Sequence, residues 1–536
     1  MKKLRTILTL LLAFAVIFGC IGCKDKAANP DEGINFPSAP FGENASGMLT
    51  DQYRFYNTDV NNTAYWHTAN THDPVMIKEG DTYYAFSTDA QFGATTKKGL
   101  HIRKSKDMIT WDFVGTALDL DSVSEAIDYV GYNRDGVKVD FFWAPEVVKR
   151  SKAGGGYEFW LFYCISAFGE RNSYIGMAKS DAVTGPYVHS HEILRTHQSV
   201  GSPNAIDPAI YTEGSGADEK MYMTYGSWNA GINLIELDPT TGEPKIKQTL
   251  ETKTVSCHTA VAGTNQDEQK LIPSSGDDPA FGTNLLRVYS AEAPHIMKHG
   301  NYYYLFVTTG NDLVYDYDVR VFRSDNIDGP YVDADGKKAV DSSSKDTFRQ
   351  YGNKVTDAHR FNYEDGDGKG WAAIGHCSTF TEGDETYLLS HYRGTHMDSA
   401  RFFLGIRKMY FIDGWPVVAA NRYAGEERQD MTGLTVSGKY LLHVLQKRVC
   451  NAKINNNKIT VDKDAIEFEL KSDGTVDSEL YDGTWEFKGN DEIEIKLGKT
   501  VYKGIVSPQW SWERDRGVLS ISAISSTGEA LWANRI

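Results

Sequence analysis

The chain has 536 residues, of which 72 are acidic and 56 basic, so its formal net charge is −16. This length exceeds one compact domain, and the acidic balance disfavours nucleic acid as a partner. Hydrophobic residues make up 41% and charged residues 24%, which excludes a collagen-like, disordered or multi-span membrane protein. The 30 Tyr, 24 Phe and 49 Gly favour strands and turns over helices.

Residues 1–23 resemble a bacterial lipoprotein signal peptide. Three basic residues precede a mostly apolar run at residues 7–18, which is short for a membrane-spanning helix. Small-residue-then-cysteine sites, where such signals are cleaved and acylated, occur at Cys20 and at Cys23, and either fits. The alternative is a plain signal peptide with incidental cysteines. We therefore expect an exported outer-membrane lipoprotein, at the cell surface or facing the periplasm, whose only membrane contact is its N-terminal lipid.

Residues 24–50 are polar and rich in Pro, Gly and Asn, which predicts a flexible tether. Without the leader the chain keeps 53 basic and 72 acidic residues, a net charge of about −19. This charge disfavours acidic polymers such as galacturonan and leaves a neutral polymer as a substrate. The remaining cysteines form no CxxC pair, which disfavours a zinc site.

One pattern recurs five times between residues 51 and 424: a short apolar entry, called a head here, then an aromatic strand, then a second run with its own Gly- or Asp-rich turn. The heads begin at Asp73, Ala144, Asp207, Ala293 and Gly375. The aromatic strands begin at Asp81, Tyr157, Lys220, Asn301 and Glu385. Antiparallel meanders repeated about a centre form a β-propeller. We therefore predict an all-β protein with a five-bladed β-propeller at 51–424; an irregular β-sandwich is the alternative.

Residues 425–536 lack the head pattern. They contain short runs of alternating polar and apolar residues, such as AIEFELKS and EIEIKLG, bounded by turn residues. This pattern predicts a separate C-terminal all-β domain, either a small β-sandwich or a barrel. It contains no evident cluster of catalytic side chains.

Three of the heads carry an acid at their start: Asp73 in HDPV, Asp207 in NAIDPAI and Glu292 in AEAPHI. The innermost strands of a propeller begin near its axis, so these acids can meet in one funnel. Cleavage of a glycosidic bond needs one carboxylic acid and one carboxylate, and a third carboxylate raises the pKa of the acid. The pattern favours a glycoside hydrolase, although spacing alone does not assign the three roles.

Seven motifs in order, from HDPVMIKEG to DGWPVVAANRYAGE, resemble those of glycoside hydrolase family 43, most of all its extracellular endo-arabinanases with an extra C-terminal β domain. The resemblance covers roughly residues 71–426. It implies an inverting enzyme that cleaves internal α-1,5-L-arabinofuranosyl linkages of plant cell-wall arabinan. Asp73 would be the general base and Glu292 the general acid, and Asp207 would tune and orient that acid. Inversion implies base and acid carboxyls about 6.5 to 9.5 Å apart.

The resemblance also implies binding residues. Trp143 of FFWAPE would stack on sugar, and Asn204 and Ser227 would contact it. His376 of GHCS would lie beside a calcium ion in the central channel, although Cys377 stands where relatives typically have Asn. We expect the protein to be a monomer.

Two alternatives remain open from the sequence. One is an exo-acting α-L-arabinofuranosidase or β-xylosidase on the same scaffold, because insertions such as residues 254–284 could block one side of the groove. The other is a non-catalytic glycan-binding surface lipoprotein. Three converging carboxylates argue against the second, since a binder of neutral sugar has little reason to desolvate them.

Overall fold

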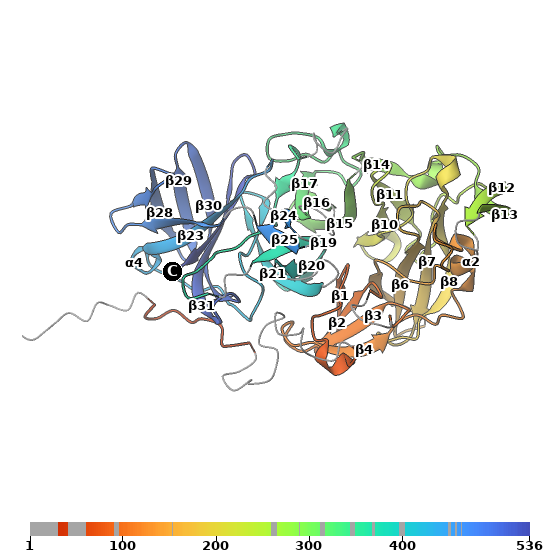
Figure 1. Cartoon of the computed structure of the whole chain (residues 1–536), viewed down its shortest axis with the longest axis horizontal. Helices are drawn as coiled ribbons and strands as arrows, with labels where there is room; N and C mark the ends of the chain where they lie inside the picture. The colour runs from red at the N-terminus through yellow and green to blue at the C-terminus, as the bar shows by residue number, and fades with distance from the viewer. Residues whose placement is uncertain are drawn as a thin grey trace, which may run out of the picture.

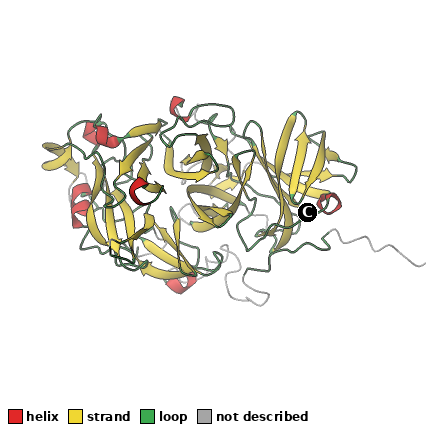
Figure 2. Cartoon of the chain, turned by 180° about the vertical axis from the view of Figure 1, so that it is seen from behind, coloured by secondary structure: helices red, strands yellow, loops and turns green. Residues whose placement is uncertain are grey.

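The computed structural model describes residues 31–40, 61–90, 96–152, 154–258, 265–288, 290–310, 317–342, 349–366, 370–395, 402–448, 452–455, 458–461 and 464–536. The predicted signal peptide, with Cys20 and Cys23, lies outside these ranges. Strands dominate the described chain, which confirms the all-β class (Figure 2). Within the described residues, no helix has the length and apolarity needed to cross a membrane.

The first two sheets each contain four antiparallel strands in chain order. The first sheet consists of β1 (Val75–Glu79), β2 (Thr82–Ser87), β3 (His101–Ser105) and β4 (Asp112–Thr116). The second consists of β5 (Glu146–Ser151), β6 (Tyr157–Ser166), β7 (Ser173–Ser180) and β8 (Val188–Thr196). The short helix α2 (Ser124–Val130), which the sequence did not predict, lies between the two sheets in the chain.

Three further antiparallel groups follow. The third has β9 (Ala209–Glu213), β10 (Lys220–Tyr225), β11 (Ile232–Leu237) and β14 (Thr283–Leu286). The fourth has β15 (Ala291–His299), β16 (Tyr302–Thr309), β17 (Asp318–Ser324) and β18 (Asn353–Lys354). The fifth has β19 (Trp371–Glu382), β20 (Glu385–Gly394), β21 (Phe403–Ile412) and β22 (Trp415–Val418). A single parallel pair, Asp318 with Ile374, joins the fourth group to the fifth.

The first strands of the five groups form a closed ring of contacts. β1 contacts β5, β5 contacts β9, β9 contacts β15, β15 contacts β19, and β19 contacts β1. Figure 1 shows the groups following one another around this part of the molecule. Each predicted head forms or enters one of these first strands, and each predicted aromatic strand forms the second. The heads are therefore brought together although they lie far apart in the sequence.

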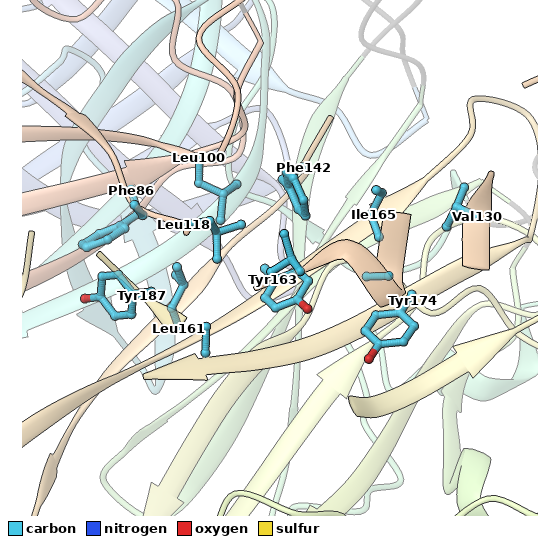
Figure 3. Packing of buried hydrophobic residues seen from close by; sticks show 14 of the residues in the cluster. Phe86, Leu100, Leu118, Val130, Phe142, Leu161, Tyr163, Ile165, Tyr174 and Tyr187 are labelled. Atoms are coloured by element: carbon cyan, nitrogen blue, oxygen red, sulfur yellow. The ribbon is translucent and has the colours of Figure 1, made fainter. Parts of the chain in front are cut away.

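The aromatic strands fill the space between neighbouring sheets. Phe86 of β2 packs with Leu161 and Tyr163 of β6, and Phe142 lies in the same buried cluster (Figure 3). Burying side chains of this size contributes roughly 1.5–3 kcal/mol each. This packing holds the first two sheets, and with them their heads, in fixed positions.

A long hairpin interrupts the third group. Strands β12 (Leu250–His258) and β13 (Asn265–Pro273) pair along their whole length and form a two-stranded sheet of their own. They occupy most of the insertion that the sequence marks between β11 and β14.

The C-terminal region is a closed barrel, which decides between the predicted sandwich and barrel. Its strand order is β23 (Gly438–Leu445), β26 (Ile466–Leu470), β27 (Thr475–Ser478), β28 (Gly483–Gly489), β29 (Glu492–Leu497), β30 (Thr500–Ser511), β31 (Arg516–Ser525) and β32 (Ala530–Arg535). Pairing of β32 with β23 closes it. A second hairpin, β24 (Ala452–Asn455) with β25 (Lys458–Val461), leaves the barrel between β23 and β26.

Residues 31–40 lie within the predicted tether, yet they contact the barrel. The Asn35 N–H donates to Gln429 Oε1 at 3.0 Å, and Gln429 Nε2 donates to the Asn35 carbonyl at 3.1 Å. Ile34 packs against the apolar barrel core. These contacts shorten the stretch of the predicted tether that could move freely.

A buried amide network joins β22 to the barrel. Asn421 Nδ2 donates to Gln509 Oε1 at 2.9 Å and to Asn534 Oδ1 at 3.0 Å, and Asn534 Nδ2 donates back to Asn421 Oδ1 at 3.1 Å. Nearby, Trp532 Nε1 donates to the Val418 carbonyl at 2.8 Å. Because these groups are buried, each lost partner leaves a desolvated polar atom behind.

We expect Asn421→Ala to lower the free energy of unfolding by about 2 kcal/mol, because it strands buried amides of the barrel. Urea unfolding followed by tryptophan fluorescence measures the change. The exposed Asn326 offers a control, since Asn326→Ala should change stability by less than about 0.5 kcal/mol. Equal stability of the two variants would contradict a structural role for the network.

Candidate active site

A cleft of about 500 Å³ lies where the heads meet. It is lined by all seven residues that the sequence singles out: Asp73, Trp143, Asn204, Asp207, Ser227, Glu292 and His376. The structure thus brings together residues that are spread over more than 300 positions of the chain.

The backbone at the heads shares an unusual conformation. Asp73, Asp207, Ala293 and His376 have φ values of 54°, 56°, 53° and 48°, in the left-handed region that non-glycine residues rarely adopt. Such strain persists only where surrounding structure imposes it, and it clusters at functional sites. Ala293, not Glu292, occupies the position equivalent to the two aspartates. Glu292 lies one residue before this position, next to a register shift in β15, so its carboxyl leaves the backbone at a different place from those of Asp73 and Asp207.

Asp73 sits among three histidines. Its Oδ1 is 2.9 Å from His376 Nδ1 and 3.4 Å from His72 Nδ1, and its backbone N–H donates to His391 Nδ1 at 3.3 Å. Burial alone would raise the pKa of Asp73, but the charges of His376 and His72 and a hydrogen bond from His376 hold that pKa well below its usual value. Asp73 is therefore a carboxylate at neutral pH and can accept a proton.

Glu292 sits among neutral donors instead. Ser227 Oγ and Trp228 Nε1 each donate to Glu292 Oε2 at 2.9 Å, and the Tyr317 hydroxyl donates to Oε1 at 2.6 Å. Hydroxyl and indole donors orient a carboxyl group without adding a formal positive charge. The two carboxyls thus occupy environments of different charge, as separate acid and base roles require.

Asp207 lies between the other two carboxyls. Its Oδ2 accepts a hydrogen bond from the backbone N–H of Ala293 at 3.1 Å, directly beside Glu292. Burial raises the pKa of Asp207 to about 7, opposed by the charge of His376 and reinforced by Glu292 and Asp73. Asp207 and Glu292 therefore repel one another when both are ionised.

His376 lines both the cleft and a small channel cavity of about 20 Å³ behind it. The channel is also lined by Asp73, Asp207 and Glu146, so it offers carboxyl oxygens as well as imidazole nitrogen. Burial raises the pKa of Glu146 to about 8, and a cation in the channel would favour its ionised form. These donors fit a hard cation such as calcium. Among the described residues, His72, Asp73 and His391 also form a compact group of possible metal ligands. Here, however, the two histidines already lie against the Asp73 carboxylate.

The predicted sugar-binding residues differ in accessibility. Trp143 is partly exposed at the cleft wall, as a stacking ring must be. Asn204 is 6% exposed and accepts a hydrogen bond from Ser173 Oγ at 2.6 Å, while the Ser227 hydroxyl is engaged by Glu292. Phe168, which the sequence did not single out, lines the cleft and is 76% exposed.

Several cleft residues were missed from the sequence: His72, Thr88, Phe168, Glu170, Trp228, Tyr317 and His391. His72 lies inside the quoted motif HDPV and Trp228 directly follows the predicted Ser227, so proximity to a predicted site residue could have indicated them. Tyr317 and His391 carry no such signal, because their neighbours in space come from distant strands.

Comparison with known proteins identifies the family. The family model described as glycosyl hydrolases family 43 matches residues 67–416, and that of a C-terminal lipocalin-like domain matches residues 420–533. The chain belongs to glycosyl hydrolase family 43. The resemblance drawn from the motifs is thereby confirmed, and so is the assignment of this chain to the glycoside hydrolases.

Individual relatives match over nearly the whole chain. The extracellular endo-α-(1→5)-L-arabinanase of Thermotoga petrophila is 28% identical over 507 residues, which cover 87% of this chain and 93% of the relative. The extracellular endo-α-(1→5)-L-arabinanase 2 of Bacillus subtilis is 26% identical over a match that covers 87% of this chain and 92% of that relative. The crystal structure of the T. petrophila endo-1,5-α-L-arabinanase superposes with a TM-score of 0.68 at 26% identity, covering 88% of this chain and 99% of that chain. The similarity therefore includes both the propeller-like part and the barrel.

The carboxyl groups of the cleft should determine the pH at which His376 titrates. Burial lowers its pKa, but Asp73, Asp207 and Glu292 raise it to about 9, so the imidazole is charged at neutral pH. In chelator-treated protein, we expect Asp73→Asn to move the His376 titration to lower pH, because the nearest negative charge is removed while burial persists. NMR of ¹⁵N-labelled imidazoles measures this, and His191, which lines no part of the cleft, should titrate as before. An unchanged His376 titration would contradict the ion pair.

Proposed function

We propose that this protein is an exported endo-1,5-α-L-arabinanase that cleaves internal α-1,5-L-arabinofuranosyl linkages of arabinan with inversion. The observation that carries the proposal is the meeting of Asp73, Asp207 and Glu292 in one cleft, with Asp73 beside histidines and Glu292 beside neutral donors. Family membership supports the reaction class, and the endo-arabinanases matched over most of both chains support the substrate.

The geometry supports a distinct role for each carboxyl. Asp73, kept ionised by its histidines, takes a proton from the water that attacks the anomeric carbon. Glu292 donates a proton to the departing glycosidic oxygen. Asp207 favours the protonated form of Glu292 through its charge and holds the adjacent backbone through the Ala293 N–H. Direct displacement requires base and acid carboxyls about 6.5 to 9.5 Å apart, with the water between them.

The sugar chain would lie along the cleft against aromatic rings. Trp143 and Phe168 offer faces on which the apolar side of a furanose can stack. Asn204 and Ser227 lie at the cleft wall, where their polar atoms would face sugar hydroxyls; the Ser227 hydroxyl also donates to Glu292. A long plant polysaccharide would enter a groove of this kind from either end.

The architecture we infer is a five-bladed β-propeller at residues 51–424 followed by a C-terminal barrel domain at 425–536. The closed ring of contacts through β1, β5, β9, β15 and β19 supports five blades, each built from one antiparallel group. The family 43 model ends at residue 416 and the model of the C-terminal domain begins at residue 420. Both support a domain boundary close to residue 424.

Calcium is proposed as the ion of the central channel, beside His376. Glu146 and Asp207 would hold it through oxygen, together with water, and His376 would join them only in its neutral form, because a metal-bound imidazole must give up its proton. Bound there, the ion would supply a fixed positive charge close to the three carboxyls. The protein groups described above carry the proton transfers themselves.

The cellular placement follows from the leader. We propose that the chain is a monomeric lipoprotein of the outer membrane, acylated at Cys20 or Cys23, and displayed at the cell surface or in the periplasm. The extracellular description of the relatives supports export. A lipid at the N-terminus would hold the barrel nearest the membrane, because residues 31–40 contact it.

An exo-acting enzyme is the second candidate. The β12–β13 hairpin ends beside the cleft, where His258 Nε2 lies 3.1 Å from the buried Glu170 Oε1, so it could close one side. The time course of products from debranched arabinan separates the two modes. We expect a ladder of oligosaccharides in the first minutes; arabinose alone would overturn endo action, and release from xylan would overturn the substrate.

Glu292→Gln tests the acid directly. We expect kcat on arabinan to fall about 10²- to 10⁴-fold with little change in KM, because the amide keeps the shape of the side chain but cannot donate the proton. Glu479→Gln, at an exposed site on the barrel, is the control and should keep the parent rate. A Glu292→Gln variant as fast as the parent would remove the hydrolase mechanism and favour a glycan-binding protein.

Calcium binding predicts a thermal shift. Adding millimolar calcium to chelator-treated protein should raise Tm by several degrees, since a ligand that binds only the folded state stabilises it. His376→Gln should abolish this shift, whereas His189→Gln, remote from the channel, should retain it. The absence of a calcium-dependent shift in the parent protein would contradict the site.

A further inference from the structure

Tyr317 connects the two carboxyls that the proposed reaction uses. Its hydroxyl donates to Glu292 Oε1 at 2.6 Å. Its ring stacks on the imidazole of His391, with centroids 5.3 Å apart and planes inclined by 2°. His391 Nδ1 in turn accepts the backbone N–H of Asp73 at 3.3 Å. One stacked pair of rings therefore spans the distance between the Glu292 carboxyl and the Asp73 backbone.

The surroundings fix the Tyr317 ring in place. The ring is buried, and a Cβ added at Gly375 would lie only 2.4 Å from two of its carbons. Position 375 can hold only glycine while Tyr317 keeps this position. Alanine side chains complete much of the remaining enclosure: Ala358, Ala372 and Ala373. Small neighbours of this kind leave room for one large ring in one orientation.

The C-terminal region contributes to the same enclosure. Val461 ends strand β25, is 9% exposed and belongs to the buried cluster around Tyr317. The β24–β25 hairpin forms a separate two-stranded sheet, outside the barrel wall, and Figure 1 shows it beside β19. The hairpin thus reaches from the C-terminal region to the wall behind the cleft.

We propose that the stacked pair of Tyr317 and His391 sets the position of Glu292 relative to Asp73, and that Val461 of the C-terminal hairpin supports this pair. Tyr317 and His391 are positioning residues in this view, and the C-terminal region completes the active site from behind. The proposal rests on the proposed function, which gives Glu292 and Asp73 the roles of acid and base.

The hydroxyl of Tyr317 separates two possible roles of this residue, positioning of the Glu292 carboxyl and filling of the buried core. An apolar core needs only the ring, whereas the hydroxyl makes a short hydrogen bond to a carboxyl group. Hydrogen bonds of this kind are among the stronger ones in proteins. Tyr317→Phe removes this bond and keeps the ring, so its effect reports on the orientation of Glu292.

The first experiment compares Tyr317→Phe with Asp207→Asn on arabinan. We expect Tyr317→Phe to lower kcat about 10- to 100-fold with KM and Tm nearly unchanged. Its pH profile should keep activity to higher pH, because a donor that favours the ionised Glu292 is gone. Asp207→Asn should lose activity at lower pH instead, because it removes a charge that disfavours ionisation of Glu292. A purely structural role of Tyr317 would leave the pH profile of Tyr317→Phe unmoved.

The second experiment tests the hairpin with a matched pair of core valines. Val461→Ala and Val476→Ala remove the same volume from buried sites, but Val476 lies in the barrel core, away from the cleft. We expect Val461→Ala to lower kcat several-fold. Val476→Ala should lower Tm by a similar amount or more and keep the parent kcat.

The outcomes separate the two proposals. If Glu292→Gln abolishes hydrolysis while Tyr317→Phe keeps the parent kcat and pH profile, the positioning role is overturned and the proposed function stands. If Val461→Ala behaves like Val476→Ala, the support from the C-terminal hairpin is overturned. If Glu292→Gln itself keeps the parent rate, the proposed function fails first. Circular dichroism of each variant verifies that it has folded.

Discussion

Three carboxyl groups are buried in one cleft, and the histidines around Asp73 decide which of them is ionised. Burial by itself would favour the neutral form of every one of these groups, because a low-dielectric interior penalises charge. His376 and His72 outweigh that penalty at Asp73, whereas the charge of His376 offsets only part of it at Asp207, whose pKa rises to about 7. One compact arrangement therefore holds a base beside groups that favour the protonated state.

This arrangement depends on the closed ring of first strands. Five antiparallel groups place their heads at one axis, and in four of these heads a residue has left-handed backbone: Asp73, Asp207, Ala293 and His376. Aromatic second strands pack between the sheets and hold that ring rigid. Strain at the centre is maintained by packing in the periphery, which is the usual way in which a protein preorganises a site.

The C-terminal barrel is tied to this scaffold at several places. The amide network around Asn421 joins β22 to the barrel, and the β24–β25 hairpin extends in the other direction to the cluster around Tyr317. Both connections are buried, so relative motion of the two parts would break hydrogen bonds or open apolar surface. A β domain without catalytic side chains of its own can influence catalysis through such contacts.

The sequence by itself determined the strands, the repeated heads and the three acids, because alternation, turn residues and Pro placement are properties of neighbouring residues. It also indicated the family, through motifs that are local. Only the tertiary structure decided that β32 closes a barrel with β23, and that Tyr317 and His391 adjoin the carboxyls. Asp73 and His391 lie 318 positions apart, and no local pattern encodes a contact over that distance. The contact between Asp73 and His391 forms only when the sheets, each specified by its own stretch of sequence, pack around one axis. That packing fixes the position of each buried ring.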